Sequence, residues 1–374
     1  MRTHATYSRH FSAGILLVAI FLILSGPRLA AQKDLADKID KIINNAMTRE
    51  GFPGISVAVI QNNKILFQKV YGVKSLQSKD PLNDNTIFSI GSVSKAFTGV
   101  GIMLLVQKNK IDLEDPIKKY MKDIPAAWGN ITIKQFMTHT SGIPDVKGEK
   151  NKESFEETLK QAAKLPMAFI PAGKKQQYNN FNFAILGKLI ERVSGMSYLD
   201  YMTTNIFKPL QMNRTGVMTN PKNVAMGHMN KNGKWEEMET HFEAGDYGIP
   251  SGGLQTSLND FIKFSQALGN NSILNANVTK AMWTPYSDKN SNTPGWHSRM
   301  AGNELVIHKG GGGTGIGSVC DFAVVPSRNL FVEVMANKSN NNISPANIVD
   351  DILLKGFKIP ADTNGANEGE GNER

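Results

Sequence analysis

Runs of strand-forming residues lie near both ends of this 374-residue chain, and this separation restricts the fold more than any other feature. The first two runs, Ile55 to Ile60 and Ile65 to Val70, flank a polar turn at 61–63 and predict a hairpin. The late runs are Leu305 to His308, Gly317 to Val325 and Leu330 to Ala336. The last two of these predict neighbouring antiparallel strands. Strands so far apart can share one sheet only if the chain between them forms an inserted unit.

Between these runs, from Thr86 to about Thr256, the apolar residues follow helical spacing. The clearest segment runs from Phe181 to Val193 and is followed by Gly195, a residue type that often ends helices. Further helical patterns occur at Asp34 to Arg49 and at Pro345 to Gly356. We therefore expect an α+β fold, in which an antiparallel sheet of N- and C-terminal strands is flanked by helices and carries an inserted, mainly helical subdomain.

The expected boundaries follow from this division. One domain spans residues 32–360, with a sheet subdomain at about 32–85 and 290–360 and a helical subdomain at about 86–289. Residues 361–374 contain almost no apolar side chains and predict a disordered tail.

The N-terminal segment has the layout of a secretory signal peptide. The basic residues Arg2, Arg9 and His10 precede an apolar run from Ala13 to Leu24, and the small pair Ala30-Ala31 follows. The run is short for a membrane span, so a cleaved signal over residues 1–31 is favoured over a retained anchor. This layout predicts a periplasmic or extracellular protein, which contacts a membrane only through this segment if the segment stays uncleaved.

Charge and cysteine content exclude several classes of function. The net charge of +9 falls to +6 without residues 1–31, because that segment carries three arginines and no acidic residue. The remaining surplus is not clustered and has no interleaved aromatic platform, so nucleic-acid binding is not expected. Cys320 is the only cysteine, which rules out a disulfide within the chain. No His-Glu-x-x-His or similar ligand cluster occurs, so we expect neither a metal nor another cofactor.

One apolar stretch carries a serine and a lysine at helical spacing. Ser92 and Lys95 precede the segment Val100 to Val106, which is apolar all round and predicts a buried helix. Residues three apart share a helix face, so Lys95 could activate Ser92 as a nucleophile. Burial and the helix dipole both disfavour the charged form of this lysine. Because Ser-x-x-Lys also arises by chance, this hypothesis needs partner residues elsewhere in the chain.

Two further motifs supply candidate partners. Tyr178 and Asn180 form the only Tyr-x-Asn of the chain, in a polar turn before a predicted helix. The segment from His308 to Gly311 ends a predicted strand, where Gly310 would let a substrate approach the backbone closely.

With Ser-x-x-Lys, Tyr-x-Asn and His-x-Gly in this order, the chain resembles the penicillin-recognising serine hydrolases. The similar branch includes class C β-lactamases, D-alanyl-D-alanine carboxypeptidases, D-amino peptidases and related esterases. Phrases around the motifs extend the likeness: Thr138 to Pro144, Pro171 to Gly173, Ser251 to Leu254 and Gly295-Trp296. It covers about Ala36 to Gly356 and implies a β-lactamase/transpeptidase-like fold and an acyl-enzyme reaction on serine without a cofactor.

The resemblance also implies catalytic roles. Ser92 would be the nucleophile, while Lys95 and Tyr178 would share the proton transfer, and either could be the base. The backbone N–H groups of Ser92 and Gly311, the residue after the third motif, would form the oxyanion hole.

Substrate contacts are expected from Asn180, His308 and Gly310. His308 replaces the lysine that is more usual in β-lactamases and carboxypeptidases, and a neutral histidine is a weaker partner for a carboxylate. Histidine here is similar to the esterase and D-amino peptidase members. Lys309 is expected to face away from the site, because adjacent strand residues point to opposite faces. The expected substrates are small esters, D-amino-acid peptides, including cell-wall-derived ones, and β-lactam-like compounds.

The same residues allow other interpretations. A non-catalytic protein that binds peptidoglycan or a peptide in this cleft is the alternative, but it would not need Ser92, Lys95 and Tyr178 together. His139 is expected to satisfy local hydrogen bonds near a helix end, not to act as a base. The run from Gly310 to Gly313 lacks the Gly-Lys-Ser/Thr of a phosphate-binding loop.

Overall fold

The fold is described from a computed structural model. It defines residues 11–146, 154–217, 223–231, 233–238, 248–287, 291–313, 316–339 and 344–360, with side chains from residue 30 onward.

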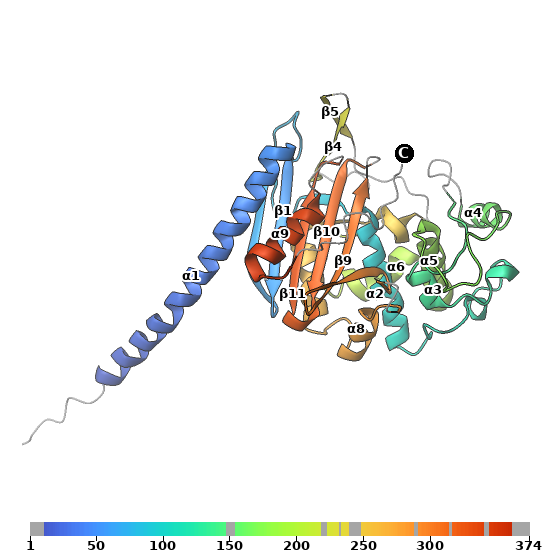
Figure 1. The fold of residues 1–374 in the computed structure, drawn as a ribbon, viewed down its shortest axis with the longest axis horizontal. Coiled ribbons are helices and arrows are strands. Elements are labelled where there is room, and N and C mark those ends of the chain that lie inside the picture. Colours follow the sequence, from blue (N-terminus) through green and yellow to red (C-terminus); the bar gives the residue numbers. More distant parts are fainter. Residues whose placement is uncertain are drawn as a thin grey trace, which may run out of the picture.

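A seven-stranded antiparallel sheet forms the centre of the molecule (Figure 1). Its order is β2-β1-β11-β10-β9-β8-β7. The strands are β1 (Gly54–Gln61), β2 (Lys64–Gly72), β7 (Asn292–Thr293), β8 (Trp296–Ala301), β9 (Glu304–Gly313), β10 (Ser318–Val325) and β11 (Leu330–Ala336). Strand β1 pairs with β11, with Ile55 opposite Ala336, so the two ends of the chain meet inside the sheet. The expected α+β fold with a sheet from both ends is confirmed.

The turn of the N-terminal hairpin follows directly from its sequence. Asn62 and Asn63 have φ values of +50° and +66°. Asparagine tolerates the left-handed region better than most residues, and two consecutive such residues form the tight turn that suits the twist of paired strands. The hairpin of β1 and β2 is confirmed.

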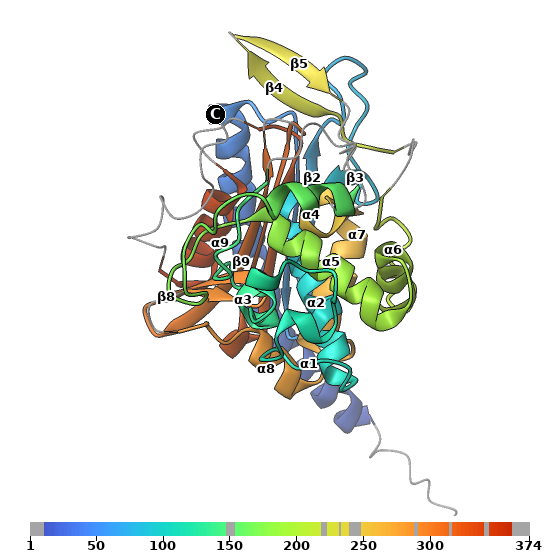
Figure 2. The same ribbon diagram turned by 90° about the vertical axis from the view of Figure 1, so that its right-hand side faces the viewer.

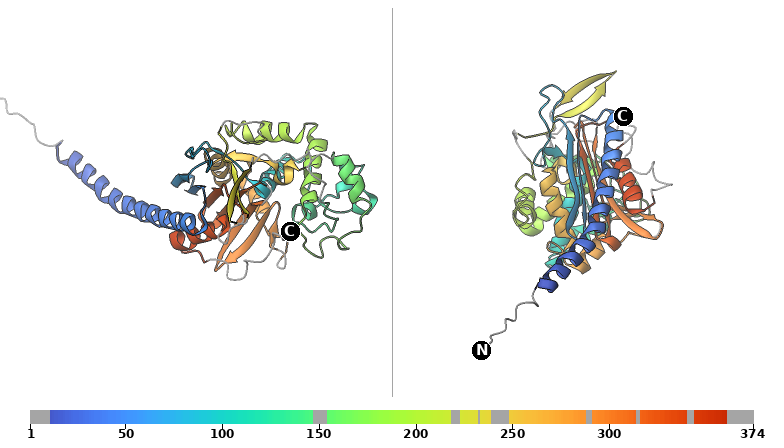
Figure 3. Two further views of the ribbon diagram at one scale, coloured as in Figure 1. Left: turned by 90° about the horizontal axis from the view of Figure 1, so that it is seen from above. Right: turned by 90° about the vertical axis from the view of Figure 1, so that its left-hand side faces the viewer.

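Two helices cover one face of the sheet: α1 (Phe11–Glu50) and α9 (Pro345–Phe357) (Figures 1 and 3). Both present apolar stripes to the strands, and the core between them includes Ile39, Ile43, Val57, Val332, Val334, Ile348 and Ile352. Burial of such side chains supplies about 1.5–3 kcal/mol each, which explains why these helices dock here.

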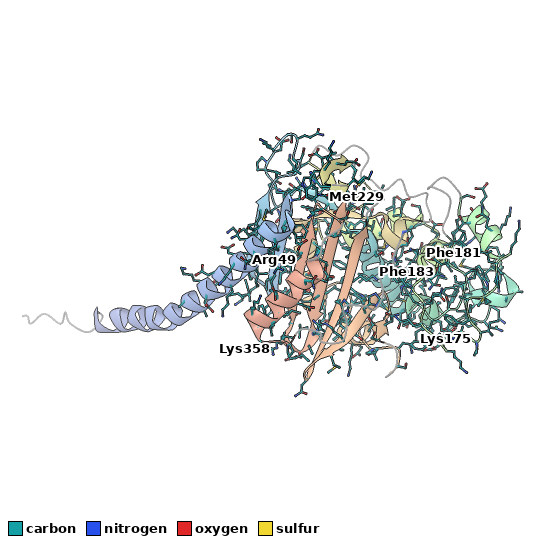
Figure 4. All side chains as sticks on the ribbon, turned by 45° about the horizontal axis from the view of Figure 1, so that its top comes forward. Arg49, Lys175, Phe181, Phe183, Met229 and Lys358 are labelled. Carbon is teal, nitrogen blue, oxygen red and sulfur yellow. The ribbon has the colours of Figure 1, made fainter. Side chains whose placement is uncertain are left out.

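The other face carries the helical half of the molecule, which Figure 2 views from its own side. Its longer elements are α2 (Ser94–Gln107), α4 (Phe155–Ala162), α5 (Asn180–Ser194), α7 (Leu258–Gly269) and α8 (Ala276–Met282). Shorter turns are η1 (Gly91–Val93), η2 (Ile117–Lys119), η3 (Ala126–Trp128), α3 (Ile133–Met137), α6 (Tyr198–Met202), η4 (Thr203–Phe207) and η5 (Ile249–Gly253). In Figure 4, Phe181 and Phe183 of α5 mark this half, away from Arg49 in α1. The predicted burial of α2 and the glycine stop of α5 are confirmed.

The mainly helical half also contains short strands, which the helical pattern of 86–256 did not predict. Strand β3 (Ile87–Ser89) pairs with β6 (Gln255–Ser257), and β4 (Gly227–Lys231) pairs with β5 (Lys234–Met238) in a projecting hairpin (Figure 2). Three-residue strands are too short to show periodicity. The hairpin did carry a signal, because Asn-Gly at 232–233 is typical of tight hairpin turns.

Strands β7 and β8 were not predicted either. Strand β8 mixes apolar Trp296 and Ala301 with polar Ser298 and Arg299, and it does not alternate regularly. It forms through its pairing with β9, which brings His297 opposite His308. Tertiary pairing therefore decides the structure here more than local sequence does.

The N-terminal helix differs from the expectation that a separate helix begins near Asp34. Helix α1 is continuous from Phe11 to Glu50, and its first part extends away from the body of the molecule (Figure 3). Within the described residues, no helix has the length and apolar character needed to span a membrane. The predicted tail at 361–374 lies outside the described residues, and the cleavage of residues 1–31 and the subdomain limits stay predictions.

Candidate active site

Ser92 lies in the 3-10 turn η1, which leads directly into α2. Gly91 has a φ of +48°, and a Cβ there would fall 2.4 Å from the backbone nitrogen of Gly312, so the position requires glycine. The Ser94 hydroxyl donates to the Gly91 carbonyl (2.7 Å) and accepts from the Leu254 N–H (3.0 Å). These contacts fix the turn and leave Ser92 half-buried at its surface.

Lys95 is fully buried in the first turn of α2, as its surroundings in the sequence predict. Its Nζ donates to the Ser251 carbonyl (2.6 Å), to Asn180 Oδ1 (2.8 Å) and to Ser92 Oγ (3.1 Å). The carbonyl and amide oxygens can only accept, so the lysine must supply those two hydrogens. The contact with Ser92 fits either an ammonium that donates to Oγ or a neutral amine that accepts the hydroxyl proton.

Tyr178 completes the set of groups around the serine. Its Oη lies 2.7 Å from Ser92 Oγ, and either oxygen can be the donor. Two lysines lie near the ring, because Lys95 Nζ is 4.9 Å and Lys309 Nζ is 5.2 Å from its centroid. These cation–π contacts hold the ring in position beside the serine.

His139 supports the tyrosine ring from within the helical half. The two ring centroids are 4.6 Å apart, and the planes are tilted by 32°. The Nδ1 atom accepts a hydrogen bond from the Asn179 N–H (3.2 Å), a more distant partner than the local one expected. Burial, followed by the charges of Lys309 and Lys95, lowers the pKa of His139 well below its usual value, so the ring is neutral.

Strand β9 forms the opposite wall of the site. Ile307 packs into the core on the α2 side, whereas Val306 packs into the core beneath α1 and α9. Since strand residues alternate between faces, Lys309 shares the Ile307 face and His308 shares the Val306 face. Lys309 is only 2% exposed, and its contact with the Tyr178 ring agrees with this orientation.

The glycines that follow make a close backbone contact with the serine turn. A Cβ on Gly311 would fall 2.6 Å from the backbone nitrogen of Ser92 and 2.5 Å from that of Val93. No side chain fits there, so glycine is what lets β9 approach the nucleophile. Gly310 lies on the other face of the strand.

Comparison with known proteins gives the family of the chain. The profile of the family described as Beta-lactamase matches residues 39–354, which is most of the chain. The chain belongs to this family.

Relatives in the Beta-lactamase family include bacterial proteins of different names. Protein Flp of Staphylococcus aureus (strain N315) is 28% identical over 332 residues, which are 83% of this chain and 64% of Flp. The chain therefore spans less than two thirds of that relative. A Beta-lactamase of Escherichia coli (strain K12) is 28% identical over 255 residues, which are 67% of this chain and 66% of that protein.

Two solved structures have a similar fold over most of this chain. The octameric penicillin-binding protein homologue from Pyrococcus abyssi superposes with a TM-score of 0.76 and 26% identity, covering 87% of this chain and 78% of that one. FmtA from Staphylococcus aureus superposes with a TM-score of 0.73, covering 89% of this chain and 92% of that one. At 24% identity, FmtA is evidence for the fold alone.

The geometry changes the register of the third Beta-lactamase-family motif in this chain. The prediction that Lys309 faces away from the site is wrong, because its Nζ lies 5.2 Å from the centroid of the Tyr178 ring. Strand alternation then puts His308 on the opposite face of β9. Side chains do alternate along β9, but the residue that points toward Ser92 is Lys309, not His308. The third motif is therefore Lys309-Gly310-Gly311. His308 is half-buried, and its ring lies 5.6 Å from that of His297. The residue after the motif is then Gly312 instead of Gly311.

Most of the predicted site residues come together, but some contributors were not predicted. The structure gathers Ser92, Lys95, Tyr178, Asn180 and Gly311. Strand alternation from Val306 puts His308 and Gly310 on the other strand face. The Ser251 carbonyl and His297 were missed, although the phrases Ser251 to Leu254 and Gly295-Trp296 pointed to their neighbourhoods. Across the described ranges, no group of three or more metal-ligating side chains is close enough to hold an ion.

Proposed function

We propose that the chain is a serine hydrolase that cleaves an ester or amide through an acyl-enzyme on Ser92. One observation carries the proposal: two groups that can exchange a proton with Ser92 Oγ contact it, Lys95 Nζ at 3.1 Å and Tyr178 Oη at 2.7 Å. A serine hydroxyl is a weak nucleophile until a neighbouring base takes its proton, and this arrangement provides for that step.

In the acylation step, Ser92 Oγ attacks the carbonyl carbon while its proton moves to the pair formed by Lys95 and Tyr178. Negative charge develops on the carbonyl oxygen, which the N–H groups of Ser92 and Gly312 would bind. One such donor is worth about 2.7–4 kcal/mol of transition-state stabilisation. The Tyr178 hydroxyl is well placed to return the proton to the leaving group, and the bond from carbon to the leaving group then breaks.

In the second step, water attacks the carbonyl carbon of the acyl-enzyme, and the same pair takes a proton of the water. The bond from that carbon to Ser92 Oγ then breaks, and the pair returns the proton to Ser92 Oγ as the acid product leaves. Asn180 would orient the acyl group. Its Oδ1 accepts from Lys95, so its amide nitrogen is the atom that would donate to a carbonyl of the substrate.

The position of Lys309 favours substrates that carry a carboxylate. A lysine ammonium is a stronger partner for an anion than a neutral histidine, and Lys309 lies beside Tyr178 where His308 was expected. β-Lactams and peptides that end in a D-amino acid carry such a group, so we propose them ahead of neutral esters.

Export through the N-terminal segment is a further part of the proposal. The basic start, the apolar run and the small residues at 30–31 support it, and the sheet packs on later residues of α1 such as Ile39 and Ile43. The test is the intact mass of the protein in the periplasm or culture medium. Loss of about the first 31 residues is expected, and Leu17→Arg should keep the chain in the cytoplasm at full length.

The decisive experiment for activity compares wild type with Ser92→Ala. A fluorescent penicillin and a fluorophosphonate should each label the wild-type protein, and β-lactams, D-Ala-D-Ala peptides and nitrophenyl esters should be screened for turnover. The matched control is Ser272→Ala, which removes an exposed hydroxyl. Labelling and turnover that survive Ser92→Ala would contradict the proposal. Ligand binding without any Ser92-dependent turnover would indicate the non-catalytic peptide- or peptidoglycan-binding alternative.

A further inference from the structure

A chain of hydrogen bonds runs from the end of α3 to Lys309. Asn292 Nδ2 donates to the Thr138 carbonyl (2.8 Å), and Asn292 Oδ1 contacts His297 Nδ1. His297 Nε2 in turn lies 3.0 Å from Lys309 Nζ. This series of hydrogen bonds links strands β7 and β8, at one side of the sheet, to the lysine that faces the serine.

The direction of each hydrogen bond follows from its partners. The Thr138 carbonyl can only accept, so it fixes the Asn292 amide with nitrogen toward it and oxygen toward His297. That oxygen accepts, so His297 Nδ1 carries the hydrogen. In a neutral ring Nε2 is then an acceptor, and the Lys309 ammonium donates to it.

The surroundings of His297 keep the ring neutral. Burial, followed by the charge of Lys309, lowers the pKa of His297 well below its usual value. A charged imidazolium would have no lone pair for the lysine, so neutrality is what makes the contact with Lys309 attractive.

Fixing a lysine is useful because its side chain is flexible. A free lysine loses side-chain entropy when it is held in one rotamer. Here His297 holds the ammonium from one side, and the Tyr178 ring lies on another at 5.2 Å. The charge is thus already in place before a substrate arrives.

We propose that His297 is a positioning residue, whose Nε2 fixes the Lys309 ammonium for the anionic group of the substrate. The inference rests on the proposed hydrolase function and deepens it, since it explains how a carboxylate-bearing substrate would be preferred. His297 itself touches neither Ser92 nor the reacting bond in this account.

The kinetic test uses two esters with the same four-carbon acyl chain, 4-nitrophenyl butyrate and mono-4-nitrophenyl succinate. Only the second carries a carboxylate. His297→Phe should lower kcat/KM for the succinate ester about 10- to 100-fold more than for the butyrate ester, because one charge-assisted hydrogen bond is lost. The loss should lie mainly in KM. His297→Gln, whose amide oxygen can accept from Lys309, should recover part of the preference.

Equal losses on both esters would overturn the proposal, as would His308→Phe removing the preference while His297→Phe keeps it. Turnover of the butyrate ester reports that each variant is folded. If wild type hydrolyses neither ester, the hydrolase proposal fails for these substrates, and a second measurement still tests His297.

That measurement is ¹⁵N NMR of protein labelled on histidine, with the His297 signal identified by its loss in His297→Gln. At pH 7 the ring should be neutral, with hydrogen on Nδ1 and none on Nε2. Lys309→Met should shift the Nε2 resonance, because the donor to it is removed. A doubly protonated ring, or a ring with hydrogen on Nε2, would overturn the proposal whatever the enzyme assay gives.

Discussion

The two walls of the site are built in different ways. The helical wall is formed by η1, α2 and the segment that leads into α5. It presents the side chains of Ser92, Lys95, Tyr178 and Asn180, which are joined by hydrogen bonds of 2.7–3.1 Å. The strand wall, formed by the end of β9, presents mostly backbone. It contributes one lysine and a run of glycines that lie against the serine turn.

This difference separates two tasks of the site. The helical wall holds the groups that move protons, and each has partners that fix it. The strand wall sets how closely backbone donors and one cation approach the nucleophile. Substitutions in the helical wall should therefore affect every substrate, whereas those in the strand wall should divide into general and substrate-specific effects.

The largest effect is expected from Lys95→Met, which breaks the helical wall. Methionine fills the space but removes the donor to Asn180 and Ser251 and one acceptor for the Ser92 proton. We expect kcat/KM to fall about 10³- to 10⁴-fold on all substrates, because general base catalysis and positioning are lost together. Lys108→Met, at the exposed end of the same helix, is the control and should behave as wild type. Full activity of Lys95→Met would remove the lysine from the mechanism.

A second prediction concerns the sheet behind the strand wall, where a buried acid is poorly satisfied. Glu333 on β11 accepts from the Ser265 hydroxyl, and its Oε2 has no hydrogen-bond partner among the residues described. Burial raises the pKa of Glu333 from an ordinary 4.5 to about 8. The folded state therefore retains a proton that the unfolded state releases near pH 4.5.

The sign of the resulting pH dependence is fixed by this shift. The stabilisation is complete below pH 4.5 and is lost as pH rises toward 8, amounting to about 3–5 kcal/mol in all. Glu333→Gln should remove most of this slope in urea unfolding measured at pH 5, 7 and 9. Glu236→Gln, an exposed site, should leave the slope intact. A wild-type protein that is more stable at pH 9 than at pH 5, with the same slope in Glu333→Gln, would contradict the assignment.

The third prediction tests the backbone of the strand wall itself. Gly311→Ala would place a Cβ 2.6 Å from the Ser92 nitrogen, so β9 must move away from the serine turn. We expect kcat/KM to fall about 10²- to 10³-fold, because a donor to the oxyanion is displaced. The loss should be similar for neutral and anionic substrates. Gly313→Ala is the matched control, because a Cβ there meets nothing within 4 Å among the described residues. If both variants lose activity equally, close approach is not the cause.

The smallest effect is expected from Lys309→Met, and only for charged substrates. Removing the ammonium should weaken kcat/KM for a carboxylate-bearing ester about 10- to 100-fold, as expected when a hydrogen bond to a charged group is lost. The matched neutral ester should change little. Lys234→Met, on the exposed strand β5, should affect neither ester. An equal loss of kcat/KM on both esters would place Lys309 among the proton-transfer groups. It would contradict the assignment of different tasks to the two walls.

The residues of the helical wall could be predicted from the sequence, because helical spacing and the order of the motifs both concern side-chain identity. Ser92 and Lys95 three positions apart had to share a face, and a buried helix had to follow them. Tyr178 and Asn180 could be placed by their turn and by their order in the chain.

The residues of the strand wall were harder to predict, because alternation shows which residues share a face of the strand but not which face meets the serine. Val306 and Ile307 are adjacent and both apolar, so nothing in the sequence says which face of β9 meets the serine. The register of the motif was therefore misplaced by one residue, onto His308. The Ser251 carbonyl was missed for a related reason, since a backbone contact leaves no signature in residue type.

The pairing of β1 with β11 has a consequence for the order of events during synthesis. The N-terminal hairpin emerges from the ribosome early, yet Ile55 has no strand partner on the β11 side until Ala336 has been made. The central sheet therefore cannot close before translation is nearly complete, and its closure requires contacts of high sequence separation, which form slowly. Until then the β11 side of β1 stays an unpaired strand edge, which only the last part of the chain can cover.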